Sequence, residues 1–499
     1  MKTNLSRRSL LVGAGTSALV RADSEAEARG SQKLPRDRGG AINTFQVEAF
    51  VKAAEEKKLG IHSLMLVKHG KVCAEGWWGP YGPEHPHMLY SLSKSFTSTA
   101  VGLAVAEGKL SLSDKVLSFF EKERPAKPDS NLAAMEVRHL LMMGTGHDKD
   151  TTGAVLGSPN GDWVKTFLSL PVEHAPGSKF VYNTGATYLL SAIVQAVTRK
   201  TVLAYLKPRL FEPLGIQNPT WETCPKGRST GGFGLSITTE DIAKLGVLLV
   251  QKGKWNDKQL LPESWVTAAT SKHISNGDPS QPSDWTQGYG YQFWRCRNGI
   301  YRGDGAFGQF CIVLPEHQGV IVLTAGSGDL QGIMNAIHEH LVPAFGRPGS
   351  THWFSGPGEP RNLNDRTIAT PTGVPTSPMA NAVYGKTYHF AENPQKIQWL
   401  KVSDKKVVVK TAAAEWKLPY STMGWARGTA EFPGYLSKKV ATHGAWIAND
   451  TLALTVVAYE TPYIHTLTCQ FVGENITLAR KTNVGFGPTE SPALTGKAS

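Results

Sequence analysis

The residues best suited to chemistry are Ser91 and Lys94, which open a run of small and apolar residues over 97–107. A run that is apolar on nearly every side predicts a helix that is buried all round. A spacing of three residues places both side chains on one helix face, so the Lys94 amine can reach the Ser91 hydroxyl. The free N–H groups of a helix N-terminus favour developing negative charge at the same place. Together these features predict an activated serine nucleophile.

Ser-x-x-Lys is a weak pattern by itself, and the chain carries a second copy at residues 403–406. The second copy falls in a polar turn between two short predicted strands, which is typical of a solvated surface. Lys94 instead precedes a wholly apolar helix, so we expect its charge to be buried beside partners. The context therefore favours Ser91 over Ser403.

Two further stretches supply candidate partners for the nucleophile. Tyr182 lies between an Ala-Pro-Gly loop and an apolar helix over 186–198, so its hydroxyl can carry a proton between Ser91 and a leaving group. An ordinary half-buried tyrosine has the same sequence signature. Residues 303–306, Gly-Asp-Gly-Ala, form a strand segment without bulk. Such a segment indicates either a simple bulge or the close approach of a ligand or of backbone.

Residues 1–29 are typical of an export signal rather than of a folded element. Arg7 and Arg8 precede a modest apolar run that ends at Val20, which resembles a twin-arginine signal. An ordinary Sec signal or a short anchor are the alternatives. No later apolar run reaches membrane-spanning length. We therefore expect an exported, periplasmic protein whose mature chain has no stable membrane insertion.

Charge and cysteine usage exclude several function classes. Removing residues 1–29 takes away five basic and three acidic residues, so the net charge falls from +12 to +10. The remaining Lys and Arg are scattered without a dense run, which argues against nucleic-acid binding. Five cysteines are too widely spaced for a Cys-x-x-Cys site, and there is no His-Glu-x-x-His motif. We therefore expect neither a metal nor a cofactor, and the oligomeric state is left open.

The 499 residues exceed one typical domain, which predicts two folded units. Residues 40–345 contain a helix, a hairpin, a series of helices and a return of strands from residue 287. This order predicts an α+β domain, with an antiparallel sheet flanked by helices and an all-helical subdomain. Residues 346–378 are rich in Pro, Gly, Ser and Thr, which indicates a linker.

Residues 379–485 show short alternating stretches that predict a small antiparallel β domain, closed as a barrel or a sandwich. We see no chemistry in this domain. Its predicted strands are 383–390, 397–402, 406–411, 445–447, 452–459, 466–472 and 476–480.

In order and spacing, these motifs resemble the serine β-lactamase and penicillin-binding-protein superfamily, in particular its class C β-lactamase-like and esterase-like branch. That family carries Ser-x-x-Lys on its central helix, Tyr-x-Asn on a loop, and Lys-Thr-Gly or His-x-Gly on a strand. The resemblance covers residues 45–345. It implies that Ser91 is acylated, that Lys94 activates it and that Tyr182 shuttles a proton. It also implies an oxyanion hole made of the N–H groups of Ser91 and Ala306, and it leaves the identity of the general base open.

The sequence departs from the family pattern at two places. Thr184 stands where the family has its Asn, and Asn183 comes one residue early, which alters the contact with a substrate amide. Gly303 replaces the Lys or His of the strand motif, and Asp304 and Gly305 follow it. Losing a cation and adding a carboxylate disfavours anionic acyl groups, unless Arg302 turns inward. We therefore predict neutral or cationic esters or amides as substrates.

The predicted function is a serine hydrolase that works through an acyl-enzyme, as an esterase, amidase or peptidase. A β-lactam-hydrolysing enzyme or a D-amino-acid peptidase is the nearest alternative. A catalytically silent ligand-binding or sensor domain with the same fold is the alternative from another class. Five tryptophans are compatible with an apolar acyl pocket, but their spacing is more typical of a core, so they stay outside the predicted site: Trp77, Trp78, Trp163, Trp285 and Trp294.

Overall fold

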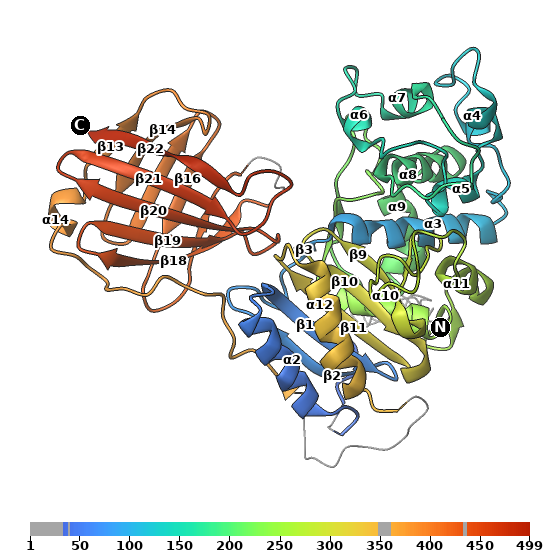
Figure 1. Cartoon of the computed structure of the whole chain (residues 1–499), viewed down its shortest axis with the longest axis horizontal. Helices are drawn as coiled ribbons and strands as arrows, with labels where there is room; N and C mark the ends of the chain where they lie inside the picture. Colours follow the sequence, from blue (N-terminus) through green and yellow to red (C-terminus); the bar gives the residue numbers. More distant parts are fainter. Residues whose placement is uncertain (1–32, 38–39, 348–360, 433–436) are drawn as a thin grey trace, which may run out of the picture.

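The computed structural model describes residues 33–37, 40–347, 361–432 and 437–499. The predicted export signal therefore lies outside the described residues. The described chain forms a mixed helix-and-sheet unit followed by a C-terminal β-barrel, as the sequence predicts (Figure 1).

A seven-stranded sheet with the order β12-β2-β1-β11-β10-β9-β8 forms the centre of the first unit. All pairs are antiparallel except β12 with β2. β1 and β11 are buried along their whole length, because helices cover both faces of the sheet. The strands are β1 (Ile61–Lys68), β2 (Lys71–Trp77), β8 (Trp294–Arg295), β9 (Tyr301–Gly305), β10 (Gln309–Leu314), β11 (Gly319–Ala325) and β12 (Arg361–Asn362).

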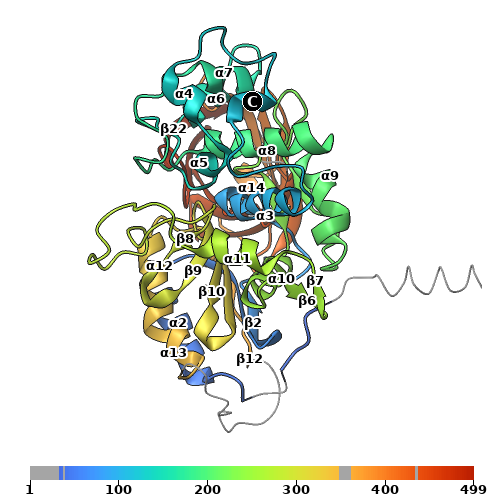
Figure 2. The ribbon, with the colours of Figure 1, turned by 90° about the vertical axis from the view of Figure 1, so that its right-hand side faces the viewer.

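The helices form two layers around this sheet and a separate helical subdomain (Figure 2). α2 (Thr44–Glu56), α12 (Leu330–Ala336) and α13 (Val342–Ala344) lie on one face, and α10 (Thr239–Val250) lies on the other. The subdomain and its neighbours comprise α4 (Ser130–Ala134), α5 (Val137–Leu141), α6 (Thr152–Leu156), α7 (Trp163–Ser169), α8 (Thr184–Thr198), α9 (Val202–Leu206) and α11 (Glu263–Thr270). Short strand pairs add β3 (His87–Met88), β4 (Thr220–Trp221), β5 (Leu235–Ile237), β6 (Lys254–Trp255) and β7 (Lys258–Gln259).

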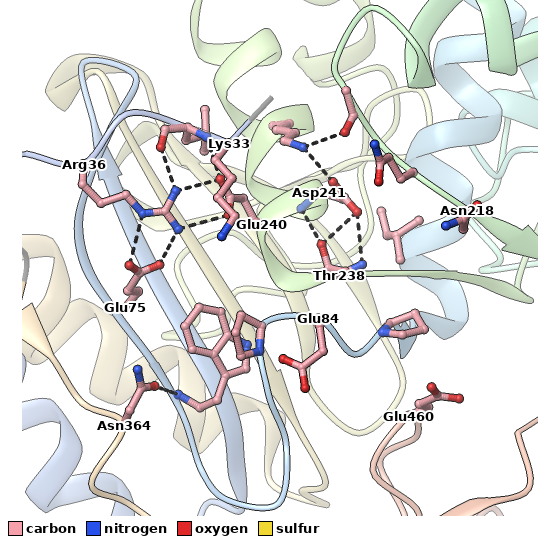
Figure 3. A pocket seen from close by; sticks show the side chains of 18 of the residues that line it. Lys33, Arg36, Glu75, Glu84, Asn218, Thr238, Glu240, Asp241, Asn364 and Glu460 are labelled. Atoms are coloured by element: carbon pink, nitrogen blue, oxygen red, sulfur yellow. Dashed lines mark hydrogen bonds and ion pairs between the residues drawn. The ribbon is translucent and has the colours of Figure 1, made fainter. Parts of the chain in front are cut away.

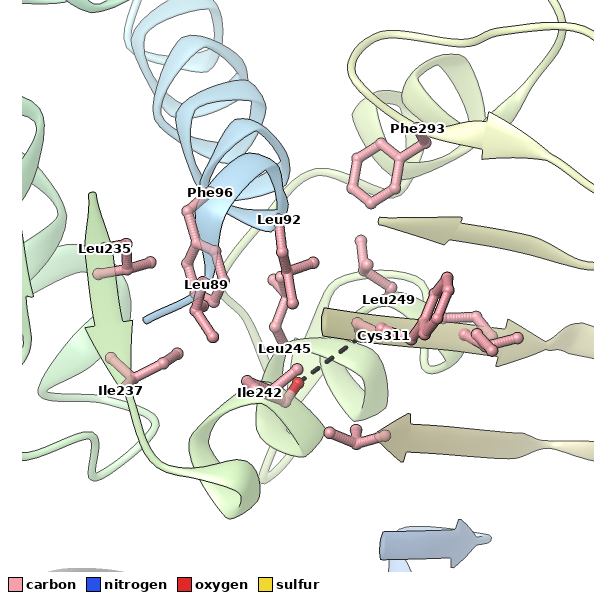
Figure 4. Close-up of a cluster of buried hydrophobic side chains, with 14 of the residues drawn as sticks. Leu89, Leu92, Phe96, Leu235, Ile237, Ile242, Leu245, Leu249, Phe293 and Cys311 are labelled. Carbon is pink, nitrogen blue, oxygen red and sulfur yellow. Dashed lines mark hydrogen bonds between the residues drawn. The ribbon is translucent and has the colours of Figure 1, made fainter. Parts of the chain in front are cut away.

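α3 (Ser93–Ala106) lies between the helical subdomain and the sheet (Figure 1). Its residues from Ser93 to Ala104 are all buried, which confirms the predicted helix without a solvent face. Phe96 and the preceding Leu92 point toward α10, where Leu245 and Leu249 carry the packing on to the sheet (Figure 4). The start of α3 is therefore held by packing against α10.

The C-terminal unit is a closed barrel of ten antiparallel strands in sequence order, with β22 pairing back to β13. Along β20, buried and exposed residues alternate, so every second side chain fills the barrel core. The strands are β13 (Thr387–Phe390), β14 (Ile397–Val402), β15 (Lys406–Thr411), β16 (Glu415–Pro419), β17 (Ala426–Thr429), β18 (Lys439–Ala448), β19 (Thr451–Val457), β20 (Ile464–Val472), β21 (Asn475–Thr482) and β22 (Glu490–Ala498), with the short helix α14 (Ala380–Val383) before them.

The structure corrects the predicted boundaries of this unit. The prediction lacked β16, β17 and β22, and its end at residue 485 is too early because β22 closes the barrel. The described part of the predicted linker is not a free tether either. β12 pairs with β2, and Leu363 is fully buried against Gly76.

Among the described residues, no single helix is long and apolar enough to cross a membrane. α8 and the segment Val202–Phe211, which is bent by 61° relative to it, together reach the required length and hydropathy, by length and composition only. All five cysteines are free thiols with buried side chains. Within the same described ranges, no group of three or more His, Cys, Asp and Glu residues is arranged to hold a metal ion.

Candidate active site

Ser91 lies in the 3₁₀ turn Tyr90–Leu92, immediately before α3, and its side chain is partly exposed. β9 runs directly alongside this turn. A Cβ added to Gly305 would lie 2.1 Å from the Leu89 carbonyl oxygen, and one added to Gly303 would lie 2.3 Å from Ser95 Oγ. The strand lacks bulk because backbone lies close to Gly305 and the side chains of Leu92 and Ser95 lie close to Gly303. This close approach decides between the two interpretations of the Gly-Asp-Gly-Ala segment.

Lys94 is 1% exposed, and its amine contacts three oxygen atoms. Its Nζ lies 3.0 Å from Ser91 Oγ, 3.0 Å from Thr184 Oγ1 and 2.8 Å from the Gly232 carbonyl oxygen. A neutral amine has two N–H donors and one lone pair. When Gly232 and Thr184 accept the two N–H groups, the lone pair faces the Ser91 hydroxyl. Lys94 is therefore placed to receive the serine proton.

The electrostatics of Lys94 match this role. Burial lowers its pKa to about 7, and the negative charges of Asp150 and Asp304 act in the opposite direction. A substantial fraction of the amine is therefore neutral near pH 7, which is the condition for general-base catalysis.

The Tyr182 hydroxyl hydrogen-bonds to Ser91, and its ring lies beside Lys94, with Nζ 4.9 Å from the ring centroid. Trp294 stacks on the Tyr182 ring, at 5.2 Å between centroids. Burial, reinforced by the charge of Asp304, raises the pKa of Tyr182 well above its usual value. Tyr182 is thus a neutral hydroxyl at rest, so Lys94 rather than a tyrosinate is the base that this geometry supports.

The turn that follows β9 is held rigidly beside Ser91. Gln309 Nε2 donates to the Ala306 carbonyl at 3.0 Å, and Ser327 N donates to the Phe307 carbonyl at 3.0 Å. A Cβ added to Gly305 would lie 3.1 Å from Ser91 N, which places the next peptide close to the nucleophile. A fixed N–H pair is what an oxyanion hole requires, and the role of the Ala306 N–H stays a prediction.

The shifted Tyr-x-Asn motif separates Thr184 from Asn183. Thr184 Oγ1 contacts Lys94, so it belongs to the site. Asn183 is fully buried and caps α8, accepting hydrogen bonds from Ala186 N at 3.2 Å and from Thr151 Oγ1 at 2.8 Å. The predicted substrate contact of Asn183 is therefore wrong: its side-chain oxygen is engaged by the helix start.

Asp304 does not leave an unpaired negative charge at the site. Arg302, which is 0% exposed, forms an ion pair with Asp304 at 2.8 Å, and its guanidinium lies 4.2 Å from the Trp285 ring centroid. Arg302 therefore neutralises Asp304, but it does not replace the cation that is missing at Gly303, because none of its surface reaches solvent.

The sequence prediction did not include Asp150. It also left all five tryptophans outside the site, although two of them contact site residues. Asp150 is exposed, and its Oδ1 accepts a hydrogen bond from Thr184 N at 3.1 Å. It also lines a cavity of about 340 Å³ beside the site. Trp294 and Trp285 flank Tyr182 and Arg302, whereas the other three tryptophans are core residues, as predicted: Trp77, Trp78 and Trp163. No short motif marks Asp150, which reaches Thr184 through tertiary folding.

A cavity of about 880 Å³ elsewhere in the molecule has a different character (Figure 3). Arg36 forms ion pairs with Glu75 at 2.7 Å and with Glu240 at 2.8 Å along its wall. Its lining contains no serine, cysteine or histidine. We interpret this network as an anchor that ties residues 33–37 to β2 and α10.

A comparison with models of protein families shows which family this chain belongs to. The model of the Beta-lactamase family matches residues 47–334, which is more than half of the chain. The chain belongs to the β-lactamase family. The Ser91 site lies within the matched residues, whereas the C-terminal barrel lies outside them.

Individual relatives of this family are distant. Protein flp of Staphylococcus aureus (strain MW2) is 26% identical over 196 residues, which is 36% of this chain and 39% of that protein. The 6-aminohexanoate-dimer hydrolase of Paenarthrobacter ureafaciens is 23% identical over 278 residues, 52% of this chain and 71% of that enzyme. The structure of EstCE1, a hydrolase with promiscuous acyltransferase activity, has a TM-score of 0.50 at 17% identity, over 59% of this chain and 98% of EstCE1. The chain thus spans about two fifths of the length of protein flp, and the structural likeness shows the fold alone.

Proposed function

We propose that this protein is a serine hydrolase that acts through an acyl-enzyme on neutral or cationic esters or amides. The observation that carries the proposal is the buried Lys94 amine, which contacts Ser91 Oγ at 3.0 Å while two other oxygens take its N–H groups. Membership of the β-lactamase family supports it, and the relatives include a protein named 6-aminohexanoate-dimer hydrolase.

The reaction follows from the contacts of four residues. Ser91 Oγ attacks the substrate carbonyl carbon while its proton passes to Lys94, and the carbonyl π electrons move to the oxygen. The N–H groups of Ser91 and Ala306 stabilise this oxyanion by about 3 kcal/mol each. The tetrahedral intermediate collapses, and the leaving group takes a proton from Tyr182, which regains one from Lys94. Water then repeats the sequence on the acyl-enzyme and releases the acid.

The charges around Ser91 support the preference for neutral or cationic substrates. Arg302 is paired with Asp304 and buried, so it offers no free cation to a substrate carboxylate. Asp150 adds an exposed negative charge next to Thr184. An anionic acyl group therefore meets repulsion without a compensating partner.

A matched pair of esters tests this preference. 4-Nitrophenyl butyrate and 4-nitrophenyl hydrogen succinate share a leaving group and chain length but differ by one carboxylate. We expect the neutral ester to have the higher kcat/KM, and we expect Asp150→Asn to narrow the difference. The substrate preference would be refuted if the anionic ester had an equal or higher kcat/KM. It would also be refuted if benzylpenicillin acylated the enzyme as fast as the neutral ester does. An acyl adduct that forms and never turns over would instead indicate the silent binding module.

Export to the periplasm by the twin-arginine route is the second part of the proposal. It is supported by Arg7 and Arg8 ahead of the apolar run. Replacing both arginines by lysine in the full chain is expected to retain the protein in the cytoplasm, as measured by cell fractionation. Unchanged export would favour a Sec signal.

A further inference from the structure

One end of the C-terminal barrel docks against the residues around the nucleophile (Figure 1). Met88 N, in β3, donates to the Glu460 carbonyl at 2.9 Å, across to the turn between β19 and β20. Asn483 Nδ2, after β21, donates to the Gly326 carbonyl at 3.0 Å, just beyond β11. Hydrogen bonds therefore fix two barrel turns to the first unit, one of them at Met88, three residues before Ser91.

Four aromatic side chains meet at this junction, and we call them the aromatic patch: Tyr90, Phe307, Tyr463 and Phe486. The hydroxyl groups of Tyr90 and Tyr463 hydrogen-bond to each other. The ring centroid of Phe307 lies 5.8 Å from that of Tyr463 and 4.8 Å from that of Phe486. The rings of Tyr90 and Phe486 are 5.6 Å apart. Each unit thus contributes two of the four rings.

The aromatic patch packs against Ala306, the predicted oxyanion residue. Tyr90 immediately precedes the nucleophile, and Phe307 immediately follows the predicted oxyanion residue Ala306. The patch therefore lies close to the position where a substrate carbonyl would bind Ser91 and Ala306.

Within the patch, burial is uneven in a way that indicates a contact surface. Phe307 and Tyr463 are each 8% exposed, whereas Phe486 is 77% exposed although its ring packs on Phe307 and Tyr90. Phe307 and Tyr463 are buried, and Phe486 packs on Phe307 while most of its own surface is exposed to water. An apolar group that settles against Phe486 would remove that surface from water and gain ring contacts.

We propose that the barrel is part of the substrate site, and that the aromatic patch binds an aromatic or large apolar group next to the scissile carbonyl. The inference rests on the proposed hydrolase function and gives it a substrate class. It also assigns a role to a domain without chemistry of its own: the catalytic unit alone supplies only Tyr90 and Phe307.

The test uses the full chain and compares ratios of kcat/KM rather than single rates. 4-Nitrophenyl phenylacetate and 4-nitrophenyl acetate place a ring, or none, on the acyl side, and benzyl acetate and methyl acetate do so on the leaving group. Phe486→Ala is expected to lower the aromatic-to-small ratio about tenfold in one of the two pairs. Tyr463→Phe keeps the ring but loses the hydrogen bond to Tyr90, so its ratio falls less.

Phe45→Ala is the matched control, because Phe45 is also an exposed phenylalanine, at 86%, but lies on α2. Its ratios are expected to equal those of the wild type. Unchanged ratios in Phe486→Ala for both pairs, with Ser91 still labelled by a fluorophosphonate, would overturn the role of the patch and leave the hydrolase function standing. A wild type that neither labels at Ser91 nor hydrolyses any of the four esters would overturn the proposed function and this inference with it.

Discussion

Acylation of Ser91 is expected to switch on across neutral pH, because the base is a buried lysine whose pKa is lowered to about 7. Below that pH the amine is protonated and has no lone pair for the serine proton; above it the lone pair is free. With a midpoint of 7, the neutral fraction is about 10% at pH 6 and about 90% at pH 8. We therefore expect kcat/KM for a neutral ester to rise about tenfold between these values and then to level off.

The assay is the initial rate of 4-nitrophenyl butyrate hydrolysis at fixed ionic strength, corrected for spontaneous hydrolysis at each pH. Lys94→Arg keeps a positive charge but supplies no base near neutral pH. It is expected to lower kcat/KM by a factor of roughly 10² to 10⁴ and to abolish the step in the profile. A flat wild-type profile between pH 6 and 8, a midpoint near the ordinary lysine value, or the same step in Lys94→Arg would refute the assignment of Lys94 as the base.

Three other predictions follow from the same geometry. Asp150→Asn removes a negative charge that favours the Lys94 ammonium, so the midpoint of the pH profile should move to lower pH; a move to higher pH would contradict the assignment. Gly305→Ala forces β9 away from the Leu89 carbonyl and should reduce fluorophosphonate labelling more than tenfold, whereas Gly424→Ala, with open space around it, should label normally. Asp304→Asn leaves the buried Arg302 without its counter-charge and should cost about 3–5 kcal/mol in urea unfolding. In that last case, an unfolding midpoint equal to that of the wild type would show that the pair contributes nothing.

The catalytic core could be predicted from sequence because local geometry dictates most of it. Ser91 and Lys94 are three residues apart at the start of one helix, so their contact depends on a single element. The glycines of β9 also marked this strand in the sequence. The nucleophile turn and the start of α3 occupy the space that side chains at Gly303 and Gly305 would fill.

The role of Asn183 was predicted wrongly for another reason. The resemblance to the family pattern assigned Asn183 to the substrate, although the N-cap preference of asparagine assigns it to the helix start. Asparagine is among the preferred N-cap residues, and an apolar helix starts directly after Asn183. That signal alone assigns Asn183 to the cap and leaves Thr184 facing Lys94.

Other parts of the site depend on contacts between distant segments, which no local pattern encodes. Asp150 reaches Thr184 across 34 residues, and Tyr463 reaches Tyr90 across 373. β22 was missed for a related reason: it contains Pro and Gly and few large apolar residues, so its strand conformation comes from pairing with β21 and β13. Tertiary context, rather than propensity, decides such elements.

The central claim is that Ser91 is an activated nucleophile. Intact-mass spectrometry after incubation with a fluorophosphonate tests it most directly, with wild type, Ser91→Ala and Ser403→Ala compared side by side. Ser403 belongs to the second Ser-x-x-Lys copy, in the turn between β14 and β15, and serves as the matched control. We expect one adduct on wild type and Ser403→Ala and none on Ser91→Ala. An adduct that persists in Ser91→Ala, or no adduct on the folded wild type, would contradict it.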